Sequence, residues 1–422
     1  MKTAAVIAEF NPFHNGHQYL LQKAKEEGAD RVVVIMSCDY LQRGEPACMG
    51  RYARAEAALR SGAADVVLAY PSRYASASAE TFAFQAVRML DSLHCIDELI
   101  FGSECGNTAP LLRCAEILVQ EPPFYREALR NGLKEGMSFP KARAQALPEY
   151  ADLLSSPNNI LGIEYLKALL RLHSSIKPKA ILREGAGYLD QDSSLQMPSA
   201  LAIREKLRRN PGNTGISSGT AEEGDSADQK KKKNILLPSN GIPSESLPVL
   251  QKEIETYGIM TAEAYASILV ERLWSCGNAL ELAAYEDVTE DLAGTFIRKR
   301  NDFQGFESFA KSCASKNLPL AHVRRALLHI ALGFRKGDFG TDAGFVQVLG
   351  FRKEAADCLA AIRLNADIPV LVNPPAERDG LQGEARRLFE EELRISNLYE
   401  ALRSMQAGIP ARNELSRPVV KV

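Results

Sequence analysis

The sequence has no apolar run approaching the roughly 20 residues that a helix needs to cross a bilayer. Its first residues, MKTAAVIAEFNPFHN, contain one short apolar run that Glu9 and Asn11 interrupt. This segment has neither the length nor the small-residue cleavage pattern of a signal peptide. These absences argue against a membrane-spanning or secreted protein, and we expect a cytoplasmic protein with no membrane partner.

Cysteine pairs and an excess of charge of one sign are also missing. The eight cysteines are scattered, and none forms the Cys-x-x-Cys pair that is typical of zinc and redox sites. We therefore expect no disulfide partner and no metal held by the protein's own ligands. The 51 basic and 53 acidic side chains leave a formal charge of −2, so no global field attracts nucleic acid. Any nucleic-acid surface must be local.

What the sequence does contain is an alternation of short apolar runs with helical patterns. The apolar runs lie at 3–9, 31–36, 65–70 and 97–102, and the predicted helices between them lie at 17–27, 51–61 and 79–92. Residues 32–35, VVVI, are apolar throughout, as expected for a strand that is buried on both faces. The alternation predicts βαβ units and an α/β fold with a Rossmann-like, doubly wound parallel sheet.

Composition changes twice farther along the chain. A last strand at 179–184 and a helix ending near residue 207 close the predicted α/β domain, residues 1–209. Residues 210–234 are rich in Gly, Ser, Asp and Lys and have almost nothing to bury, so they are predicted to be a flexible linker or loop. Residues 235–422 are predicted to form a mainly helical C-terminal domain.

The strongest motif is HNGH at 14–17, which follows the first predicted strand and precedes the first predicted helix. Glycine at position 16 lets the backbone approach a ligand closely, and the free N–H groups of a helix start favour phosphate. His14 and His17 are placed to donate hydrogen bonds to a phosphate that gains charge during an in-line displacement. The motif predicts a nucleotide-using enzyme.

The motif resembles the HxGH signature of the nucleotidylyltransferase superfamily. More narrowly, five segments in order resemble the bacterial tRNA(Met) cytidine acetate ligase family: AEFNPFHNGHQYLL, MSCDYLQRGEPA, FGSE, PNNILGIEYLKAL and AILREGAGY. This resemblance implies an enzyme that activates acetate with ATP and Mg2+ as acetyl-adenylate, releasing pyrophosphate. The acetyl group would then pass to the exocyclic amine of the wobble cytidine in elongator tRNA(Met).

The same resemblance implies the residues of the site. His14 and His17 would be catalytic. The implied ATP-binding residues are Ile7, Ala8, Glu9, Phe10, Asn11, Pro12, Phe13, His14, Asn15, Gly16, His17, Gln18, Tyr19, Leu20, Gly102, Asn158, Asn159, Arg183, Glu184, Ser199 and Arg204. Of the two asparagines, either one would bind the nucleotide or merely cap the helix.

Two departures from the family pattern are visible. Cys38 stands where the pattern has glycine, and MPSALAIREKL at 197–207 has Leu201 where a hydroxyl is common. Ser199 is therefore either a phosphate ligand or a helix cap. Arg43 and Glu45 also fall at the carboxyl edge of the sheet, and the sequence leaves open whether they contact acetate, phosphate or RNA.

A local basic stretch is the predicted tRNA-binding surface. Between residues 297 and 336 nine Lys or Arg residues stand against two acidic ones. Its predicted RNA contacts are Arg298, Lys299, Arg300, Lys311, Lys316, Arg324 and Arg325. Recognition of an anticodon loop often uses aromatic platforms. Phe303, Phe306 and Phe309 are either such platforms or core residues.

Two other functions compete with this reading. A nucleotidylyltransferase that adenylylates a small phosphorylated metabolite would have the same fold, but it would need no large second domain such as 235–422. A nucleotide-binding regulator without catalysis would seldom require both His14 and His17 at a reacting phosphate. The ATP-dependent tRNA ligase is therefore the predicted function.

Overall fold

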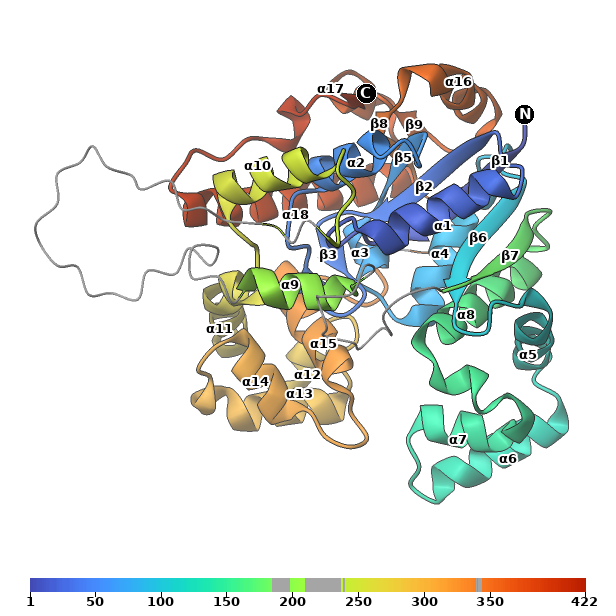
Figure 1. Ribbon diagram of the computed structural model, residues 1–422. Coiled ribbons are helices and arrows are strands. Elements are labelled where there is room, and N and C mark those ends of the chain that lie inside the picture. Colours follow the sequence, from blue (N-terminus) through green and yellow to red (C-terminus); the bar gives the residue numbers. More distant parts are fainter. Residues whose placement is uncertain (184–197, 209–236, 238–239, 339, 341–343) are drawn as a thin grey trace, which may run out of the picture.

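A computed structural model describes residues 1–183, 198–208, 237, 240–338, 340 and 344–422 of this chain, and a mixed β-sheet stands at its centre (Figure 1). The strand order is β10-β8-β5-β2-β1-β6-β7, and β9 pairs with β8. All these pairings are parallel except that of β5 with β8. The strands are β1 (Thr3–Ala8), β2 (Arg31–Ser37), β5 (Val66–Tyr70), β6 (Glu98–Ser103), β7 (Lys177–Leu182), β8 (Val346–Phe351), β9 (Val370–Leu371) and β10 (Val420–Lys421).

The central strands are buried on both faces, which explains their unbroken apolar runs. In β2, Val32 and Val34 point into one hydrophobic core, whereas Val33 and Ile35 point into another on the opposite face. The register places Val34 beside Val6 of β1. The predicted doubly wound α/β fold is thus confirmed, because successive side chains of one strand feed two separate cores.

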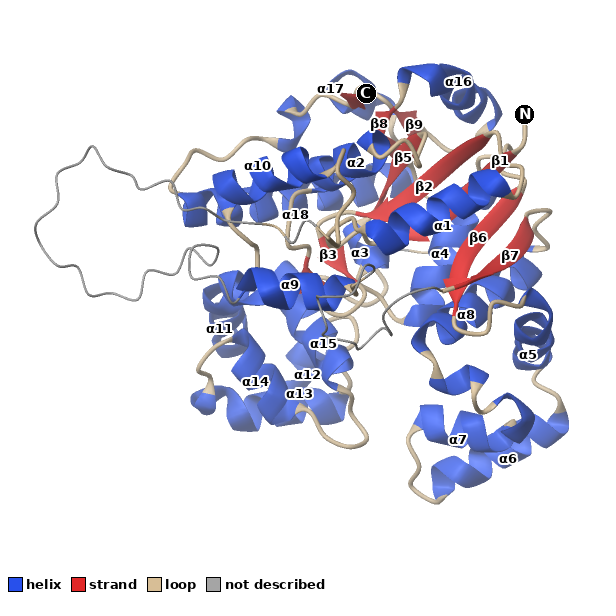
Figure 2. Ribbon diagram, in the orientation of Figure 1, coloured by secondary structure: helices blue, strands red, loops and turns tan. Residues whose placement is uncertain are grey.

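Helices cover both faces of the sheet (Figure 2). One core includes residues of α1 (Asn15–Glu26), α2 (Arg51–Arg60) and α10 (Leu247–Tyr257). The other includes residues of α4 (Ala79–Asp91), α5 (Thr108–Gln120), α8 (Pro157–Leu172) and α16 (Ala356–Asn365). The pair α6 (Pro123–Lys134) and α7 (Phe139–Ala146) projects beyond this layer, next to α5 and α8.

A third core belongs to a group of C-terminal helices. These helices are α11 (Ala266–Ser275), α12 (Ala279–Ala283), α13 (Glu290–Lys299), α14 (Phe306–Cys313) and α15 (Leu320–Leu332). Phe306 and Phe309 are buried in this core, and Phe303 packs against it, so the three phenylalanines are core residues rather than exposed platforms. Side chains of the long helix α18 (Gly383–Ala407) join the same core.

The C-terminal part also contributes strands, which the prediction of a mainly helical domain did not include. Strand β8 pairs antiparallel with β5 and so extends the N-terminal sheet. Val346 and Val348 are buried in one hydrophobic core and Leu349 in the other, so β8 is covered on both faces like the central strands. Along the chain, the short helix α17 (Pro374–Glu377) follows β9 and precedes α18. The proposed domain limits at 209 and 235 stay a prediction, and the predicted linker 210–234 lies outside the described residues.

The structure also bears on membrane-spanning helices and on the state of the cysteines. In the described ranges no helix combines the length and the apolar character that crossing a membrane requires. All eight cysteines are free thiols, and six of them are buried. Burial raises the pKa of Cys48 and Cys114 to about 11, which keeps both thiols protonated near neutral pH.

Candidate active site

A cleft opens at the carboxyl ends of β1, β6 and β7 and encloses about 1210 Å³ of empty space, part of it open to solvent. The predicted ATP-binding residues that line it are Ile7, Ala8, Glu9, Phe10, Asn11, His14, His17, Leu20, Gly102, Asn158, Arg183, Ser199 and Arg204. Those that do not line it are Pro12, Phe13, Asn15, Gly16, Gln18, Tyr19 and Asn159. Glu184 lies outside the described residues.

A sharp turn after β1 carries the chain from the sheet into α1. Phe10 at its start has φ +47°, a left-handed conformation that is rare for a bulky residue. The Asn11 side-chain oxygen accepts a hydrogen bond from the Cys48 N–H at 2.8 Å, and this bond ties the turn to the segment after β4. The Phe10 and Phe13 rings meet edge to face at 4.9 Å, and both rings contact that of His17. The turn is therefore packed rigidly beneath the histidines.

His14 and His17 form a reciprocal cap on α1. His14 is the N-cap residue, and its Nδ1 accepts from the Gly16 N–H at 3.1 Å. The His17 Nδ1 accepts from the His14 N–H at 3.3 Å. The two rings stack with centroids 3.7 Å apart. Gly16 makes room for this arrangement, because a Cβ there would lie 3.0 Å from Cε1 of His14.

The cap also decides the protonation of both rings. Because each Nδ1 accepts a hydrogen bond, the neutral ring carries its proton on Nε2, so Nε2 is a donor. Burial lowers the pKa of His14 to about 3, and the cations Arg183 and Arg204 act in the same direction. Burial, followed by His14 and Arg183, also holds the pKa of His17 well below its usual value. Both histidines therefore enter the cleft as neutral Nε2–H donors near neutral pH.

Arg204 supplies positive charge on one wall of the cleft. This residue lies on α9 (Ala200–Arg208). Ser199 directly precedes the helix, and its Oγ accepts from the Ala202 N–H at 3.0 Å. The buried guanidinium donates to the Asn11 carbonyl at 2.8 Å and to Glu45 Oε1 at 3.0 Å. Ser199 thus caps the helix and also lines the cleft. Arg204 is held against the turn that carries the histidines.

Asn158 and Asn159, at the start of α8, make different contacts. Asn159 supports the loop after β6: its Oδ1 accepts from the Cys105 N–H at 3.2 Å, and its N–H donates to Glu104 Oε2 at 2.8 Å. Asn158 lines the cleft, and its Oδ1 accepts from the Arg183 guanidinium at 3.4 Å. A Cβ on Gly102 would lie 3.2 Å from Cγ of Arg183, so this glycine lets the arginine cross the end of the strand.

A hairpin of β3 (Tyr40–Leu41) and β4 (Glu45–Pro46) forms the third wall, through Gln42, Arg43 and Glu45. Gly44 at its tip has φ +75° and packs directly on the backbone of α15. A Cβ at this position would lie 2.2 Å from the Arg325 nitrogen, which is far inside van der Waals contact. The hairpin therefore joins the cleft to the C-terminal helices.

Gly44→Ala is expected to destabilise the protein by more than about 2 kcal/mol and to weaken ATP binding, because a backbone clash adds to the cost of a left-handed alanine. The measurement is urea unfolding together with titration of a non-hydrolysable ATP analogue. Gly62→Ala is the matched control, since Gly62 has φ +73° and nothing within 4 Å of the added Cβ. Equal losses of stability in the two variants would contradict the predicted clash.

The predicted RNA-contacting residues differ in their surroundings. Arg298, Lys311 and Lys316 are exposed. Lys299 donates to the Ser312 carbonyl, and Arg300 donates to two carbonyls at the end of α11. Arg324 and Arg325 make ion pairs with Glu307 at 2.5 Å and with Asp287 at 2.8 Å. The structure thus gathers Arg298, Lys299 and Arg300 at one helix end and places the arginines of α15 among carboxylates.

Sequence reasoning missed part of the cleft. Phe82 of α4, Phe101 of β6, and Leu161 and Tyr165 of α8 form an apolar side of the cleft. The positions 158, 161 and 165 follow helical spacing, so the face that carries Asn158 could have indicated the other two residues. Nothing local could have indicated Phe82, because its helix reaches the cleft only through packing across the sheet.

Comparison with known proteins agrees with this geometry. The chain matches the family described as HIGH Nucleotidyl Transferase over residues 1–411. It is 31% identical to the tRNA(Met) cytidine acetate ligase of Halothermothrix orenii, over 100% of both chains. It is 33% identical to the protein of the same name from Thermoanaerobacter sp. strain X514, over 94% of this chain and 95% of that one.

Solved structures give the same likeness. The crystal structure of Thermotoga maritima TmcAL bound with alpha-thio ATP matches with a TM-score of 0.85 and 27% identity, over 100% of this chain and 99% of that one. The apo form of Thermotoga maritima TmcAL matches with a TM-score of 0.86 and 27% identity, over 100% of both chains.

Proposed function

The chain belongs to the HIGH nucleotidyl transferase family and, within it, to the tRNA(Met) cytidine acetate ligases, and from this premise we propose that it acetylates the wobble cytidine of elongator tRNA(Met). In the first step an acetate oxygen attacks the α-phosphorus of ATP, and pyrophosphate leaves. In the second step the cytidine exocyclic amine attacks the carbonyl carbon of acetyl-adenylate. An N-acetylated cytidine, AMP and one proton are the products.

The observation that carries this proposal is the pair of neutral donors at the start of α1. Nε2 of His14 and Nε2 of His17 are free of the helix cap, because Nδ1 of each ring makes the capping bond. Negative charge builds on the phosphoryl oxygens as acetate attacks, and donors fixed in advance stabilise that charge. Arg183 and Arg204, which both line the cleft, add positive charge near His14. A thioATP-bound relative with the same fold supports the cleft as the nucleotide site.

The ATP contacts are proposed for the residues predicted from the sequence, and Glu184 among them lies outside the described residues. Arg183 follows β7 and Arg204 lies on α9, so the two arginines reach the cleft from different elements, and both act electrostatically on His14. Among the described residues, no three His, Cys, Asp or Glu side chains cluster as a metal site. Mg2+ would arrive with ATP, and the candidate carboxylate for it is that of Glu9, which lines the cleft and uses Oε1 to accept from the Gln42 N–H at 2.9 Å. The ion would screen the β- and γ-phosphates.

The second substrate is proposed to bind through the C-terminal part. Exposed Arg298, Lys311 and Lys316 can neutralise RNA phosphates without breaking ion pairs. Because Arg324 and Arg325 are engaged with carboxylates, they contribute to RNA binding only if those pairs exchange partners. The names of the relatives do not favour the alternative reaction, which is adenylylation of a small phosphorylated metabolite.

The test is incorporation of labelled acetate into unmodified elongator tRNA(Met) by the purified protein. We expect label in the anticodon cytidine only when ATP is present. Acetate-dependent exchange of labelled pyrophosphate into ATP would report the first step without RNA. Absence of both signals, with folded protein and intact tRNA, would overturn the proposal and direct the search to small-molecule acceptors.

A further inference from the structure

The only tryptophan of the chain, Trp274, lies at the end of α11 and is 53% exposed. Tryptophan is usually among the most buried residues on average, because its indole removes a large apolar area from water. The guanidinium of Arg300 lies over the indole at 4.6 Å from the ring centroid. In the described part of the chain the indole makes no ring–ring contact, and no other cation lies over it. The indole of Trp274 is thus held by Arg300 and partly exposed to solvent.

Arg300 is fixed in this position by the protein itself. Its Nη1 donates to the carbonyls of Leu273 and Cys276, both at 3.3 Å. These carbonyls belong to the C-terminal end of α11, where a cation is favoured by the helix dipole. The guanidinium plane is therefore tied to the same helix end that carries Trp274, and the pair forms one rigid unit.

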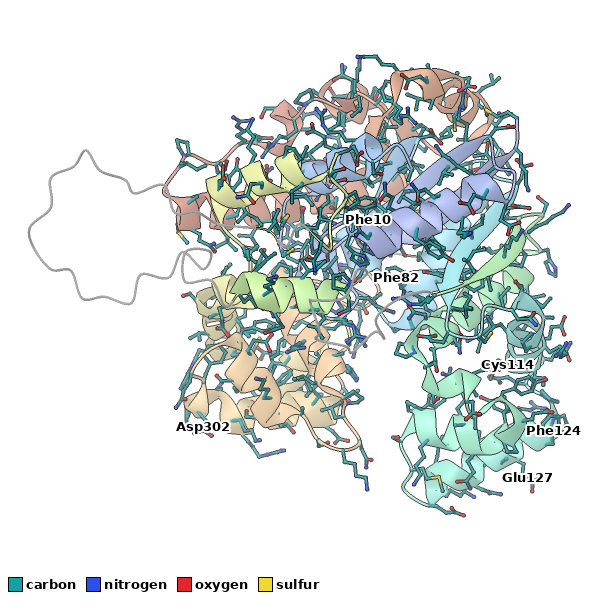
Figure 3. All side chains as sticks on the ribbon, in the orientation of Figure 1. Phe10, Phe82, Cys114, Phe124, Glu127 and Asp302 are labelled. Carbon is teal, nitrogen blue, oxygen red and sulfur yellow. The ribbon has the colours of Figure 1, made fainter. Side chains whose placement is uncertain are left out.

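The surroundings of this pair favour an anionic partner. Arg298 is exposed at the end of α13, two residues before Arg300, and Arg272 of α11 is also exposed. Acidic residues also lie nearby: Glu271, which lies 3.7 Å from Arg272, Glu281, whose carboxylate accepts from the Gly277 N–H at 3.0 Å, and exposed Asp302. Figures 1 and 3 place this end of the molecule, with Asp302 labelled, among α11, α13 and α14. The local excess of cations comes from the run Arg298, Lys299 and Arg300 at the end of α13, and such a run beside an exposed indole matches the charge of a nucleic-acid backbone.

We propose that Trp274, braced by Arg300, is a stacking platform for an unpaired nucleotide of the tRNA substrate. The proposal rests on the proposed function and adds to it a base-contacting residue. Proteins bind unstacked bases on aromatic faces and on arginine planes, and each such stack commonly strengthens binding several-fold or more. The platform takes the place of the phenylalanines at 303, 306 and 309, which are part of the core.

The proposal can be tested directly, because all tryptophan fluorescence of this protein comes from residue 274. Titration of the full chain with unmodified elongator tRNA(Met) is expected to quench the emission and saturate together with binding. Free N-acetyltryptophanamide corrects for absorption of light by the RNA. Unchanged emission at saturating tRNA would overturn the proposal. A change that depends on protein concentration without RNA would also overturn it, because a second copy of the chain would then cover the indole.

Variants give an independent measurement. Trp274→Ala is expected to weaken tRNA binding roughly 5- to 100-fold, whereas Trp274→Phe keeps an aromatic face and loses less. Phe124→Ala is the matched control, since Phe124 is 59% exposed on α6, which lies on the other side of the molecule from α11 in Figure 1. Thermal unfolding checks that each variant is folded. Equal affinity of Trp274→Ala and wild type would overturn the platform.

Failure of the platform and failure of the proposed function are distinguishable. Wild-type protein that exchanges pyrophosphate in the presence of acetate and binds tRNA with unchanged emission retains the proposed function and loses the platform. Wild-type protein that neither exchanges pyrophosphate nor binds tRNA loses both.

Discussion

Alanine in place of His14 or His17 is expected to slow acetate-dependent pyrophosphate exchange by roughly 100- to 1000-fold, the usual effect of removing one donor to a developing oxyanion. The KM for ATP should change much less, because these donors act mainly on charge that appears as acetate attacks. Burial lowers the pKa of both rings, so both are neutral donors in the free protein. The measurement is the exchange rate over a range of ATP and acetate concentrations.

Alanine at position 14 also removes the cap of α1, and this second effect must be separated from catalysis. Loss of an N-cap side chain costs about 1 kcal/mol. His14→Asn is the matched variant, because asparagine Oδ1 can accept from the Gly16 N–H as His14 Nδ1 does, but it has no group at the position of Nε2. We expect His14→Asn to restore stability but not exchange. Recovery of exchange in His14→Asn would mean that His14 acts through the helix start and not as a donor.

The sheet and the histidine turn were predictable because both are local. A parallel strand with helices on both faces must be apolar at every position, and residues 32–35 show this directly. The HNGH motif could be recognised in the sequence because it lies between a predicted strand and a predicted helix. The structure adds the reason for its residue types: each imidazole uses one nitrogen for the cap and keeps the other for the cleft, and Gly16 clears space for the first ring.

Features that depend on residues far apart in sequence were not predictable in the same way. Asn158 and Asn159 are equivalent as helix-start residues, and both bond to Glu104; only the positions of Cys105 and Arg183 assign one to the loop and the other to the cleft. In the sequence, strand β8 is a short, mostly apolar segment inside a region of helical pattern. It becomes a strand because it pairs with β5, which is far away in the sequence. Trp274 gives no local signal at all, because exposure is a property of the packed helices.

Arg51 is the centre of a buried ionic cluster that the sequence also did not reveal. This residue of α2 is 2% exposed. Its guanidinium contacts Asp39, pairs with Glu392 at 2.7 Å and lies 3.7 Å from Glu414. Glu392 lies on α18 and accepts from the Ser72 N–H at 2.7 Å. The cluster therefore fastens the C-terminal helix to the first half of the chain.

Arg51→Met is expected to lower the free energy of unfolding by about 3 to 5 kcal/mol, since it leaves buried carboxylates without their cation. Urea unfolding followed by circular dichroism measures the effect. Arg31→Met is the matched control, because Arg31 pairs with Asp357 at 2.9 Å near the surface, where such a pair contributes about 0 to 1 kcal/mol. A loss of under about 1 kcal/mol in Arg51→Met would mean that the carboxylates become protonated or hydrated at little cost. In that case apolar contacts of α18, and not Arg51, would hold the two parts of the chain together.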